Sequence, residues 1–339
     1  MMRSLKIAVE HWALREPFRI SGYAFTHADL VVVTLEEAGA RGQGEAAGVY
    51  YKGETPEEME RQIETVRGAI EAGADRNALR ELLPPGGARN AVDCALWDLE
   101  AKLSGVPAWQ TAGLQMPTAL SSTYTIGAEP PEKVALAARA YAPARLIKLK
   151  LTGDESDAAR LKAARRARPD AWIAIDANQG FTREKLDRLM PLFVDIGVQM
   201  IEQPVAVGRE DQLDRLNSPI PIAADESVQS LDDIAAAKGR FDVINIKLDK
   251  CGGLTEALMM AERVREAGMR PMVGCMSGTS LAMIPGCLAG QVCDFVDMDG
   301  AMPLAQDREP SVVYRDGRII CTARGWGSPS PAAAEALIF

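Results

Sequence analysis

The sequence lacks the features that direct a chain to a membrane or to nucleic acid. No apolar stretch approaches the ~20 residues that a transmembrane helix needs, and the first residues contain no signal-peptide core. No basic stripe is present, and 47 acidic residues against 38 basic ones give a net charge of −9. We therefore expect no nucleic-acid partner and no membrane partner.

Disulfide and metal-thiolate signatures are also missing. The chain has 6 cysteines, several of them in apolar runs, and none forms a Cys-x-x-Cys pair. This usage favours reduced, buried thiols in a cytoplasmic protein. With 339 residues and 47% hydrophobic content, the chain can bury one large core or two medium ones.

The first third of the chain predicts a small α+β domain. Residues 3–10 and 29–36 resemble strands. Thr55-Pro56-Glu57-Glu58 is typical of a helix start, and this helix should end near residue 72. A second long helix is predicted over 87–103. Strands followed by helices, without alternation, indicate an α+β domain over residues 1–112.

Strict strand–helix alternation follows and predicts a barrel. Eight strands separated by seven helices are one helix short of a complete (β/α)8 barrel, so we expect an α/β fold, a modified TIM barrel (β/α)7β, over 113–308. An open doubly wound sheet is the alternative. The tail, 309–339, should fold back on the first domain. The strands are expected at 120–126, 145–150, 172–176, 198–202, 220–224, 242–247, 271–275 and 293–297, and the helices at 130–142, 155–168, 182–196, 209–217, 230–238, 253–268 and 278–290.

Three carboxylates follow three consecutive buried strands. Trp172-Ile-Ala-Ile ends on Asp176, and the next two strands end on Glu202 and Asp225. The spacing is about one strand–helix–loop unit, so the acids should meet on one rim of the barrel. Unpaired buried charges are expensive, and a hard divalent cation is the simplest partner for them.

Lysines lie on either side of these acids. Lys148 and Lys150 share one face of the second strand, and Lys247 ends the sixth strand, across the barrel. Two lysines on opposite sides of a cation suit removal of a proton from one face of a carbon and its return to the other. A proton α to a carboxylate is very weakly acidic, so Mg²⁺ would have to stabilise the enediolate. We expect lysine pKa values lowered by desolvation, by the cation and by the Lys148–Lys150 proximity.

Together these motifs resemble the muconate-lactonising-enzyme subgroup of the enolase superfamily. The resemblance covers nearly the whole chain, and residues 88–105 look like a helix of that family's capping domain. Asp297-Met-Asp299 resembles the Asp-x-Asp of dipeptide epimerases, which holds the substrate's α-ammonium. The matching motifs are Lys148-x-Lys150, Asp176-Ala-Asn, Glu202-Gln-Pro, Asp225-Glu-Ser and Asn245-Ile-Lys247.

The resemblance implies a mechanism and a set of roles. A dipeptide epimerase inverts the α-carbon of the C-terminal residue by two-lysine 1,1-proton transfer through a metal-stabilised enediolate. Family members are often homo-oligomers. The implied roles are Lys150 and Lys247 as acid/base residues, Lys148 assisting them, Asp176, Glu202 and Asp225 as ligands of one Mg²⁺ per subunit, and Asp297 and Asp299 as ammonium ligands.

The residues expected to touch the substrate side chain depart from the alanyl-glutamate epimerases. Those enzymes carry a lid arginine, whereas residues 20–27 contain none, although Arg19 precedes them. We therefore expect a hydrophobic or mixed dipeptide rather than an acidic one. The predicted contacts are Tyr23 and Phe25 in the first lid stretch, Tyr50 with Tyr51 and Lys52 in the second, and Cys275 and Met276 after the seventh barrel strand.

Several other functions stay open. An N-acylamino-acid racemase, an o-succinylbenzoate synthase or a cycloisomerase would keep the acids and lysines, but their substrates have no free ammonium for Asp297 and Asp299. A barrel aldolase would use one lysine as a Schiff base and need no three-acid metal site. The chain could also be an inactive barrel that serves as a binding module.

Overall fold

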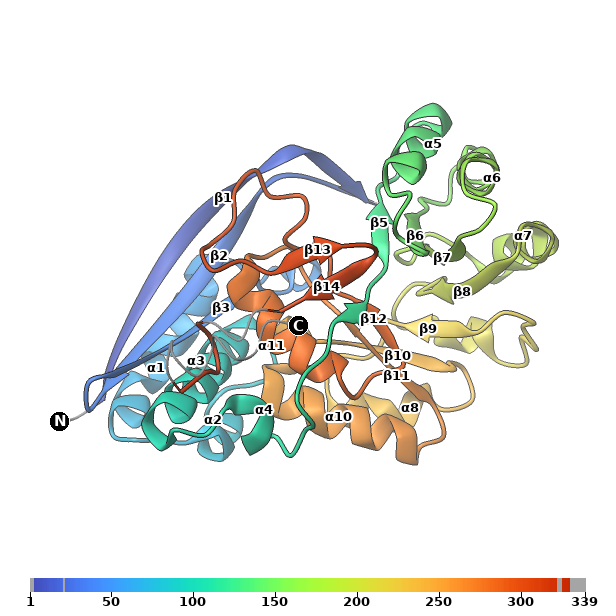
Figure 1. Cartoon of the computed structure of the whole chain (residues 1–339). Helices are drawn as coiled ribbons and strands as arrows, with labels where there is room; N and C mark the ends of the chain where they lie inside the picture. The colour runs from blue at the N-terminus through green and yellow to red at the C-terminus, as the bar shows by residue number, and fades with distance from the viewer. Residues whose placement is uncertain (1–2, 21, 322–324, 330–339) are drawn as a thin grey trace.

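The computed structural model describes residues 3–20, 22–321 and 325–329, arranged as a capping domain beside a barrel (Figure 1). The capping domain holds an antiparallel sheet of order β1-β2-β3 and a group of helices. Its elements are β1 (Ser4–Ile20), β2 (Tyr23–Glu37), β3 (Ala40–Ala46), the 3-10 helix η1 (Tyr50–Lys52), α1 (Pro56–Glu71), α2 (Arg76–Leu82), α3 (Gly87–Ser104) and α4 (Ala108–Thr111).

The predicted start of α1 is confirmed. Thr55 accepts a hydrogen bond from the backbone N–H of Glu58, and Pro56 occupies the first helical turn. Helix α3 is buried along almost its whole length because β3 lies directly against it. A Cβ atom at Gly42 or Gly44 would come within 2.3 or 2.2 Å of α3 backbone oxygens, so these glycines permit the contact.

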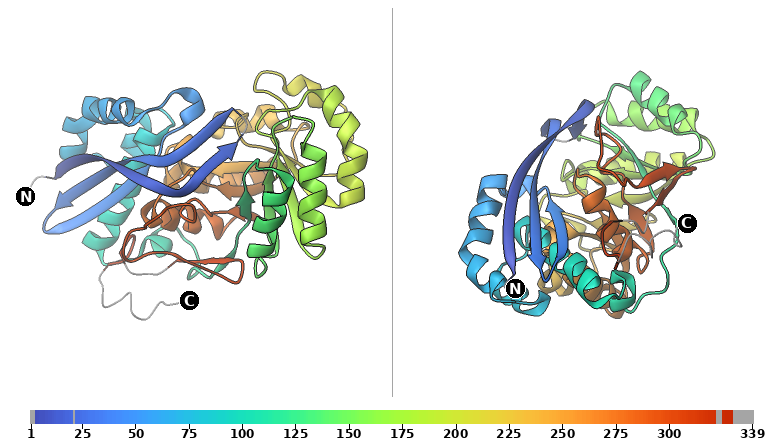
Figure 2. Two further views of the ribbon diagram at one scale, coloured as in Figure 1. Left: turned by 90° about the horizontal axis from the view of Figure 1, so that it is seen from above. Right: turned by 60° about the vertical axis from the view of Figure 1, so that its left-hand side comes forward.

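The β1–β2 hairpin is much longer than the predicted strands, 3–10 and 29–36. It runs as an arm from the capping helices to the barrel, as two further views show (Figure 2). Its outer part pairs with the barrel: Arg15 N–H donates to the Pro303 carbonyl at 2.9 Å, and Ala305 N–H donates to the Ala13 carbonyl at 2.8 Å. This outer part has no continuous buried face, so the sequence carried no alternating pattern there.

Eight parallel strands in the order β5 to β12 form the barrel, as predicted. Thr123 N–H donates to the Val296 carbonyl at 2.9 Å and joins the two outermost strands. Small and sulfur-containing side chains fill the interior below the rim, among them Ala174, Met200 and Met272. The strands are β5 (Tyr124–Ile126), β6 (Leu146–Lys150), β7 (Trp172–Asp176), β8 (Val198–Glu202), β9 (Ile222–Ala224), β10 (Val243–Lys247), β11 (Arg270–Gly274) and β12 (Phe295–Asp297).

Most predicted barrel helices are present, but the one predicted over 209–217 is wrong. That stretch holds only the 3-10 helix η2 (Glu210–Leu213), because Arg215 and Asn217 have positive φ angles of 57° and 26°. The stretch 230–238 is divided into the 3-10 helix η3 (Leu231–Asp233) and α8 (Ile234–Ala237). The other helices are α5 (Pro131–Ala140), α6 (Asp157–Ala167), α7 (Arg183–Ile196), α9 (Leu248–Cys251), α10 (Leu254–Glu266) and α11 (Ser280–Gly290).

After the barrel, the chain forms β13 (Val313–Arg315) and β14 (Arg318–Ile320), and β14 pairs with β4 (Leu120–Ser121). Farther on, Trp326 Nε1 donates to the Cys94 carbonyl of α3 at 3.1 Å. The rest of the predicted fold-back, 330–339, lies outside the described residues. Within the described part of the chain, no helix has the length and apolarity needed to cross a membrane.

Buried carboxylates join the two domains. Glu45 of β3 accepts hydrogen bonds from the backbone and hydroxyl of Thr279, at the start of α11. Asp93 of α3 does the same for Thr255, at the start of α10. In the opposite direction, Asp249 of the barrel accepts from two backbone N–H groups of residues 47 and 48. Each domain therefore satisfies backbone donors of the other.

Candidate active site

The three predicted metal ligands meet at the carboxyl ends of adjacent strands. Asp176 ends β7, Glu202 ends β8, and Asp225 directly follows β9. One oxygen of each lies within 4.8 Å of one oxygen of each other acid. All three side chains are buried, with exposures of 0%, 0% and 1%. Buried charges packed this closely need positive partners.

The lysines supply part of that positive charge. Lys150 Nζ lies 2.5 Å from Asp176 Oδ2. Lys247 Nζ lies 2.7 Å from Asp225 Oδ2, on the opposite side of the acid cluster. Lys148 reaches Glu202 Oε2 at 3.3 Å and also donates to Asp297. The rim therefore brings together all six residues predicted for metal binding and acid/base chemistry.

The protein's own groups, taken without a cation, raise the pKa values of Lys148 and Lys247 rather than lower them. Burial lowers the pKa of each, but neighbouring carboxylates outweigh it. Asp297, Glu202 and Asp176 raise the pKa of Lys148 well above its usual value, and Asp225 does so for Lys247. The expected lowering included the positive charge of a cation held by the same acids, so it stays a prediction for the cation-bound site.

The acids respond differently to the same surroundings. Burial and the Asp176 charge raise the pKa of Glu202 to about 7. Burial also works to raise the pKa of Asp225, but Lys247 and Lys250 together lower it below its usual value. The protein's own groups thus raise the pKa of one metal acid and lower that of another.

Asp297 and Asp299 lie beside β5, next to the lysines. Asp297 accepts hydrogen bonds from the hydroxyl of Thr123 and from Lys148. Asp299 accepts from the backbone N–H of Thr125 at 2.6 Å. Burial and the nearby Asp297 raise the pKa of Asp299 to about 6. The pair therefore places negative charge on the rim, close to Lys148.

The predicted lid residues form an aromatic cluster. The ring centroids of Tyr23 and Tyr50 are 4.7 Å apart, and those of Phe25 and Tyr50 are 5.3 Å apart. Tyr51 Oη accepts a hydrogen bond from Gln229 Nε2 at 3.0 Å, which ties the second lid stretch to the barrel. Arg19 lies 3.9 Å from Glu129 as an ion pair.

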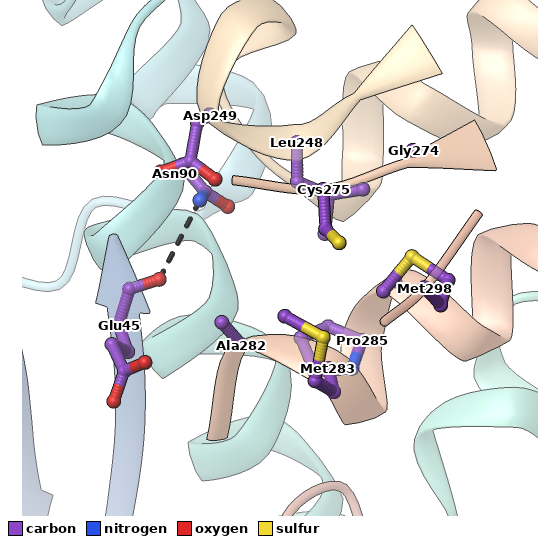
Figure 3. A pocket seen from close by; sticks show the side chains of 11 residues that line it. Glu45, Asn90, Leu248, Asp249, Gly274, Cys275, Ala282, Met283, Pro285 and Met298 are labelled. Carbon is purple, nitrogen blue, oxygen red and sulfur yellow. Dashed lines mark hydrogen bonds between the residues drawn. The ribbon is translucent and has the colours of Figure 1, made fainter. Parts of the chain in front are cut away.

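Cys275 lies in a small cavity behind the rim (Figure 3). The cavity separates the end of β11 from the capping domain and has a volume of about 10 Å³, enough for roughly one water molecule. Glu45 and Asn90 of the capping domain also line it. Met276 is 9% exposed. Cys275 therefore lines the junction between the domains, and its thiol also donates to the Asp297 carbonyl of the rim at 3.3 Å.

The sequence did not reveal two buried residues that hold the acids in place. Lys250 of α9 donates to Asp225 Oδ1 at 2.7 Å. The side-chain oxygen of Gln203 accepts a hydrogen bond from the backbone N–H of Asp225 at 2.9 Å. The backbone of Gln203 has a positive φ of 35°. A positive φ directly after a strand end marks an unusual residue in a structure, but a sequence does not show φ angles.

Unpaired acceptors adjoin the acid cluster. Among the described residues, the buried oxygens Asn178 Oδ1, Glu226 Oε2 and Asn245 Oδ1 have no donor. Asn178 and Glu226 bond each other through their other atoms, at 3.2 Å. A hydrated cation would bring both positive charge and water O–H donors to this group. The three acids offer only carboxylate oxygens, the ligands that hard divalent cations prefer, so the residues fit such a cation.

Comparison with known proteins gives matches along nearly the whole chain. Residues 2–113 match the mandelate racemase/muconate lactonizing enzyme N-terminal domain, and residues 132–328 match the enolase C-terminal domain-like family. The L-Ala-D/L-Glu epimerase of Escherichia coli (strain K12) is 38% identical over 94% of this chain and 99% of that protein.

Two solved structures extend the similarity to the fold. An enolase family member from Agrobacterium tumefaciens with homology to dipeptide epimerases, with bound sodium and L-Ala-L-Glu, has a TM-score of 0.92 and 39% identity. It covers 98% of this chain and 99% of its own. The dipeptide epimerase from Methylococcus capsulatus, complexed with Mg and L-Arg-D-Lys, has a TM-score of 0.87 and 33% identity, over 94% of this chain and 97% of its own.

Proposed function

The chain belongs to the mandelate racemase/muconate lactonizing enzyme family, and on that basis we propose that it is a Mg²⁺-dependent dipeptide epimerase. One observation carries the proposal: two lysines flank three buried carboxylates, and an acidic pair lies on the same rim. The lysines suit proton transfer, the carboxylates suit a cation, and the acidic pair suits an ammonium group.

The chain's own residues define the steps. Asp297 and Asp299 attract the substrate's α-ammonium and hold the dipeptide with its C-terminal α-carbon between Lys150 and Lys247. One lysine, neutral at that moment, removes the α-proton, and the other donates a proton to the opposite face. Bound at Asp176, Glu202 and Asp225, Mg²⁺ supplies positive charge that stabilises the developing enediolate.

Lys148 has a separate task in this scheme. It is 3% exposed and bridges the metal acids and Asp297, with Nζ to oxygen distances of 3.3 Å to Glu202 and 3.8 Å to Asp176. Its charge offsets part of the negative charge between the cation site and the ammonium site. We assign it to positioning and charge balance rather than to proton transfer.

The preferred C-terminal residue is proposed to be hydrophobic or aromatic. The Escherichia coli relative is named for glutamate, and the Agrobacterium structure holds L-Ala-L-Glu. In this chain the lid presents Tyr23, Phe25 and Tyr50 as one aromatic surface. Such a surface binds an apolar substrate side chain favourably, and its rings provide no positive charge for a side-chain carboxylate. Lys52 at the end of η1 is the lid cation that could reverse this preference.

Deuterium uptake tests the proposal without a guess about side chains. The protein is incubated with Mg²⁺ and a pool of L,L-dipeptides in D₂O, and mass spectrometry follows incorporation. We expect uptake in apolar dipeptides, and its loss in EDTA and in Lys150→Ala. Lys162→Ala, on the exposed face of α6, is the matched control and should keep full uptake. The absence of uptake in every dipeptide would refute the proposal.

The specificity has its own outcomes in the same experiment. A clear preference for C-terminal glutamate or aspartate would contradict the hydrophobic assignment while leaving epimerase chemistry intact. Repeating the assay with Lys52→Met then shows whether that lysine carries the acidic preference.

An N-acylamino-acid racemase is the second candidate, because Asp297 is already paired with Lys148 and Thr123. If the acidic pair serves only to hold Lys148, a free ammonium is not needed. Exchange in N-acetylated amino acids, and none in free dipeptides, would favour this candidate.

We also propose that the protein works in the cytoplasm as a homo-oligomer. The 6 cysteines are all free thiols, three of them buried, which suits a reducing compartment. Light scattering after size-exclusion chromatography measures the mass. A mass of one chain at working concentration would contradict the oligomer.

A further inference from the structure

Each metal acid has one oxygen that faces a rim lysine. We call these the front oxygens and take them as the atoms that a bound cation would contact. The pairs are Asp176 Oδ2 with Lys150 at 2.5 Å, Glu202 Oε2 with Lys148 at 3.3 Å, and Asp225 Oδ2 with Lys247 at 2.7 Å.

The second oxygen of each acid accepts from another donor, which is none of Lys148, Lys150 and Lys247. We call these atoms the back oxygens. The pairs are Asp176 Oδ1 with the backbone N–H of Asn178 at 2.9 Å, Glu202 Oε1 with Asn245 Nδ2 at 2.8 Å, and Asp225 Oδ1 with Lys250 Nζ at 2.7 Å.

Lys250 is fixed more firmly than a lysine in an ordinary salt bridge. It is 1% exposed, and its ammonium also donates to the Asp225 carbonyl at 2.5 Å and to the Asn245 carbonyl at 2.9 Å. All three of its protons are therefore used. Leaving Asp225 Oδ1 would strand a buried charge, so this bond persists when the front oxygen changes partner.

Asn245 is confined in a similar way. It is fully buried at 0% exposure, and a Cβ atom on Gly274 of the neighbouring strand would come within 2.5 Å of its Oδ1. The glycine leaves just enough room for the amide to sit in this orientation. The donor to Glu202 Oε1 is thus held by packing as well as by its hydrogen bond.

We propose that Lys250 and Asn245 are positioning residues that restrict Asp225 and Glu202 to one oxygen each toward the cation, and so select Mg²⁺ over Ca²⁺. Mg²⁺ requires near-octahedral geometry at 2.0–2.1 Å, whereas Ca²⁺ accepts six to eight oxygens and often takes carboxylates through both. Occupied back oxygens remove the second contact that Ca²⁺ would use. This inference rests on the proposed cation site.

The test measures cation selectivity rather than turnover. The metal-free protein is titrated calorimetrically with MgCl₂ and with CaCl₂ at one ionic strength, and the two dissociation constants give a ratio. In Lys250→Met the back oxygen of Asp225 is free, and we expect the affinity for Ca²⁺ relative to Mg²⁺ to rise about tenfold, the low end for outer partners of metal ligands. Losing the lysine charge can strengthen binding of both ions, but it does not alter their ratio.

Two further variants keep the result interpretable. Lys238→Met removes an equal charge from an exposed position and should leave the ratio unchanged. Asn245→Ala frees the back oxygen of Glu202 without touching a lysine, and carries the test if Lys250→Met does not fold, as judged by circular dichroism. It should shift the ratio in the same direction.

The outcomes separate this inference from the proposed function. One outcome is that the unmodified protein binds Mg²⁺ while both site variants keep its Ca²⁺-to-Mg²⁺ affinity ratio within twofold. That result overturns the positioning role and leaves the proposed epimerase intact. Failure of the unmodified protein to bind either ion overturns the cation site, and the inference with it.

Discussion

The rim of the barrel and the lid of the capping domain are built in opposite ways. On the rim, Asp176, Glu202 and Asp225 are at most 1% exposed, and each has a donor on both oxygens. In the described part of the lid, residues 22–27 and 50–52, side chains meet mainly through ring contacts, and Tyr23 is 45% exposed. The rim tolerates little change because every charge depends on another, whereas the lid can change one ring without stranding a charge.

The difference separates chemistry from specificity. Proton transfer needs groups held to a fraction of an ångström, which interlocked buried charges provide. Recognition of different side chains needs a surface that can be altered independently, which a loop on a firm support provides. Substitutions on the rim should therefore reduce the rate of the reaction, whereas substitutions in the lid should change the preferred substrate.

The strongest test of the rim removes one base at a time. Lys150→Ala and Lys247→Ala should each reduce epimerisation by about 10²–10⁴-fold, because general acid–base catalysis contributes on that order. Since the lysines lie on opposite sides of the acids, each variant should also lose deuterium exchange with one epimer more than with the other. Equal loss for both epimers in both variants would contradict a two-base arrangement.

Asp297→Asn tests where the rim meets the substrate's amino end. We expect KM for dipeptides to rise by about 30-fold or more, in line with the loss of one partner of a buried charge pair. N-acetylated dipeptides, which lack the ammonium, provide the internal control. The unmodified enzyme should discriminate against them, and the variant should not.

The lid should respond with a change of preference rather than a loss of chemistry. Phe25→Arg places a cation in the aromatic cluster and should improve kcat/KM for a C-terminal glutamate about tenfold relative to leucine, the effect of roughly 1.4 kcal/mol. Phe25→Leu, the size control, should not favour glutamate. A large fall in kcat for all substrates would show that lid and rim are not separable.

The smallest effect on catalysis is expected at the joint between lid and rim, where the change should appear in stability instead. Burial raises the pKa of Asp249 from 3.8 to about 7, so the folded protein holds this proton more tightly than the unfolded chain. Stability should therefore fall as pH rises from about 4 to 7. Both N–H donors end on Oδ1, which an asparagine retains.

Asp249→Asn should remove that loss of stability. At pH 8 we expect its free energy of unfolding to exceed that of the unmodified protein by about 1–4 kcal/mol, and to match it near pH 4. Urea unfolding at the two pH values measures both. Asp195→Asn, at an exposed position of α7, is the control. A variant that is less stable at both pH values would contradict the burial argument.

The same contrast explains what the sequence could predict. The rim motifs could be predicted because a buried strand that ends on a charged residue is a local sequence pattern, as at Asp176 and Lys247. The hairpin arm was predicted too short, because pairing with residues 303–305 rather than burial stabilises its outer half. No role was predicted for Lys250, or for Gln203 of the Glu202-Gln-Pro motif, because each contacts Asp225 from a different strand–helix unit and no local pattern marks that contact.

The exchange of buried carboxylates between the two domains has a consequence for how each domain folds. Without Glu45 and Asp93, the barrel helices α11 and α10 would begin with unsatisfied backbone donors. Without Asp249, the backbone N–H groups of residues 47 and 48, just before η1, would also be unsatisfied. We therefore expect that neither domain, produced without the other, folds as stably as it does in the whole chain. The two domains depend on each other for helix starts and loop donors, not only for a shared apolar interface.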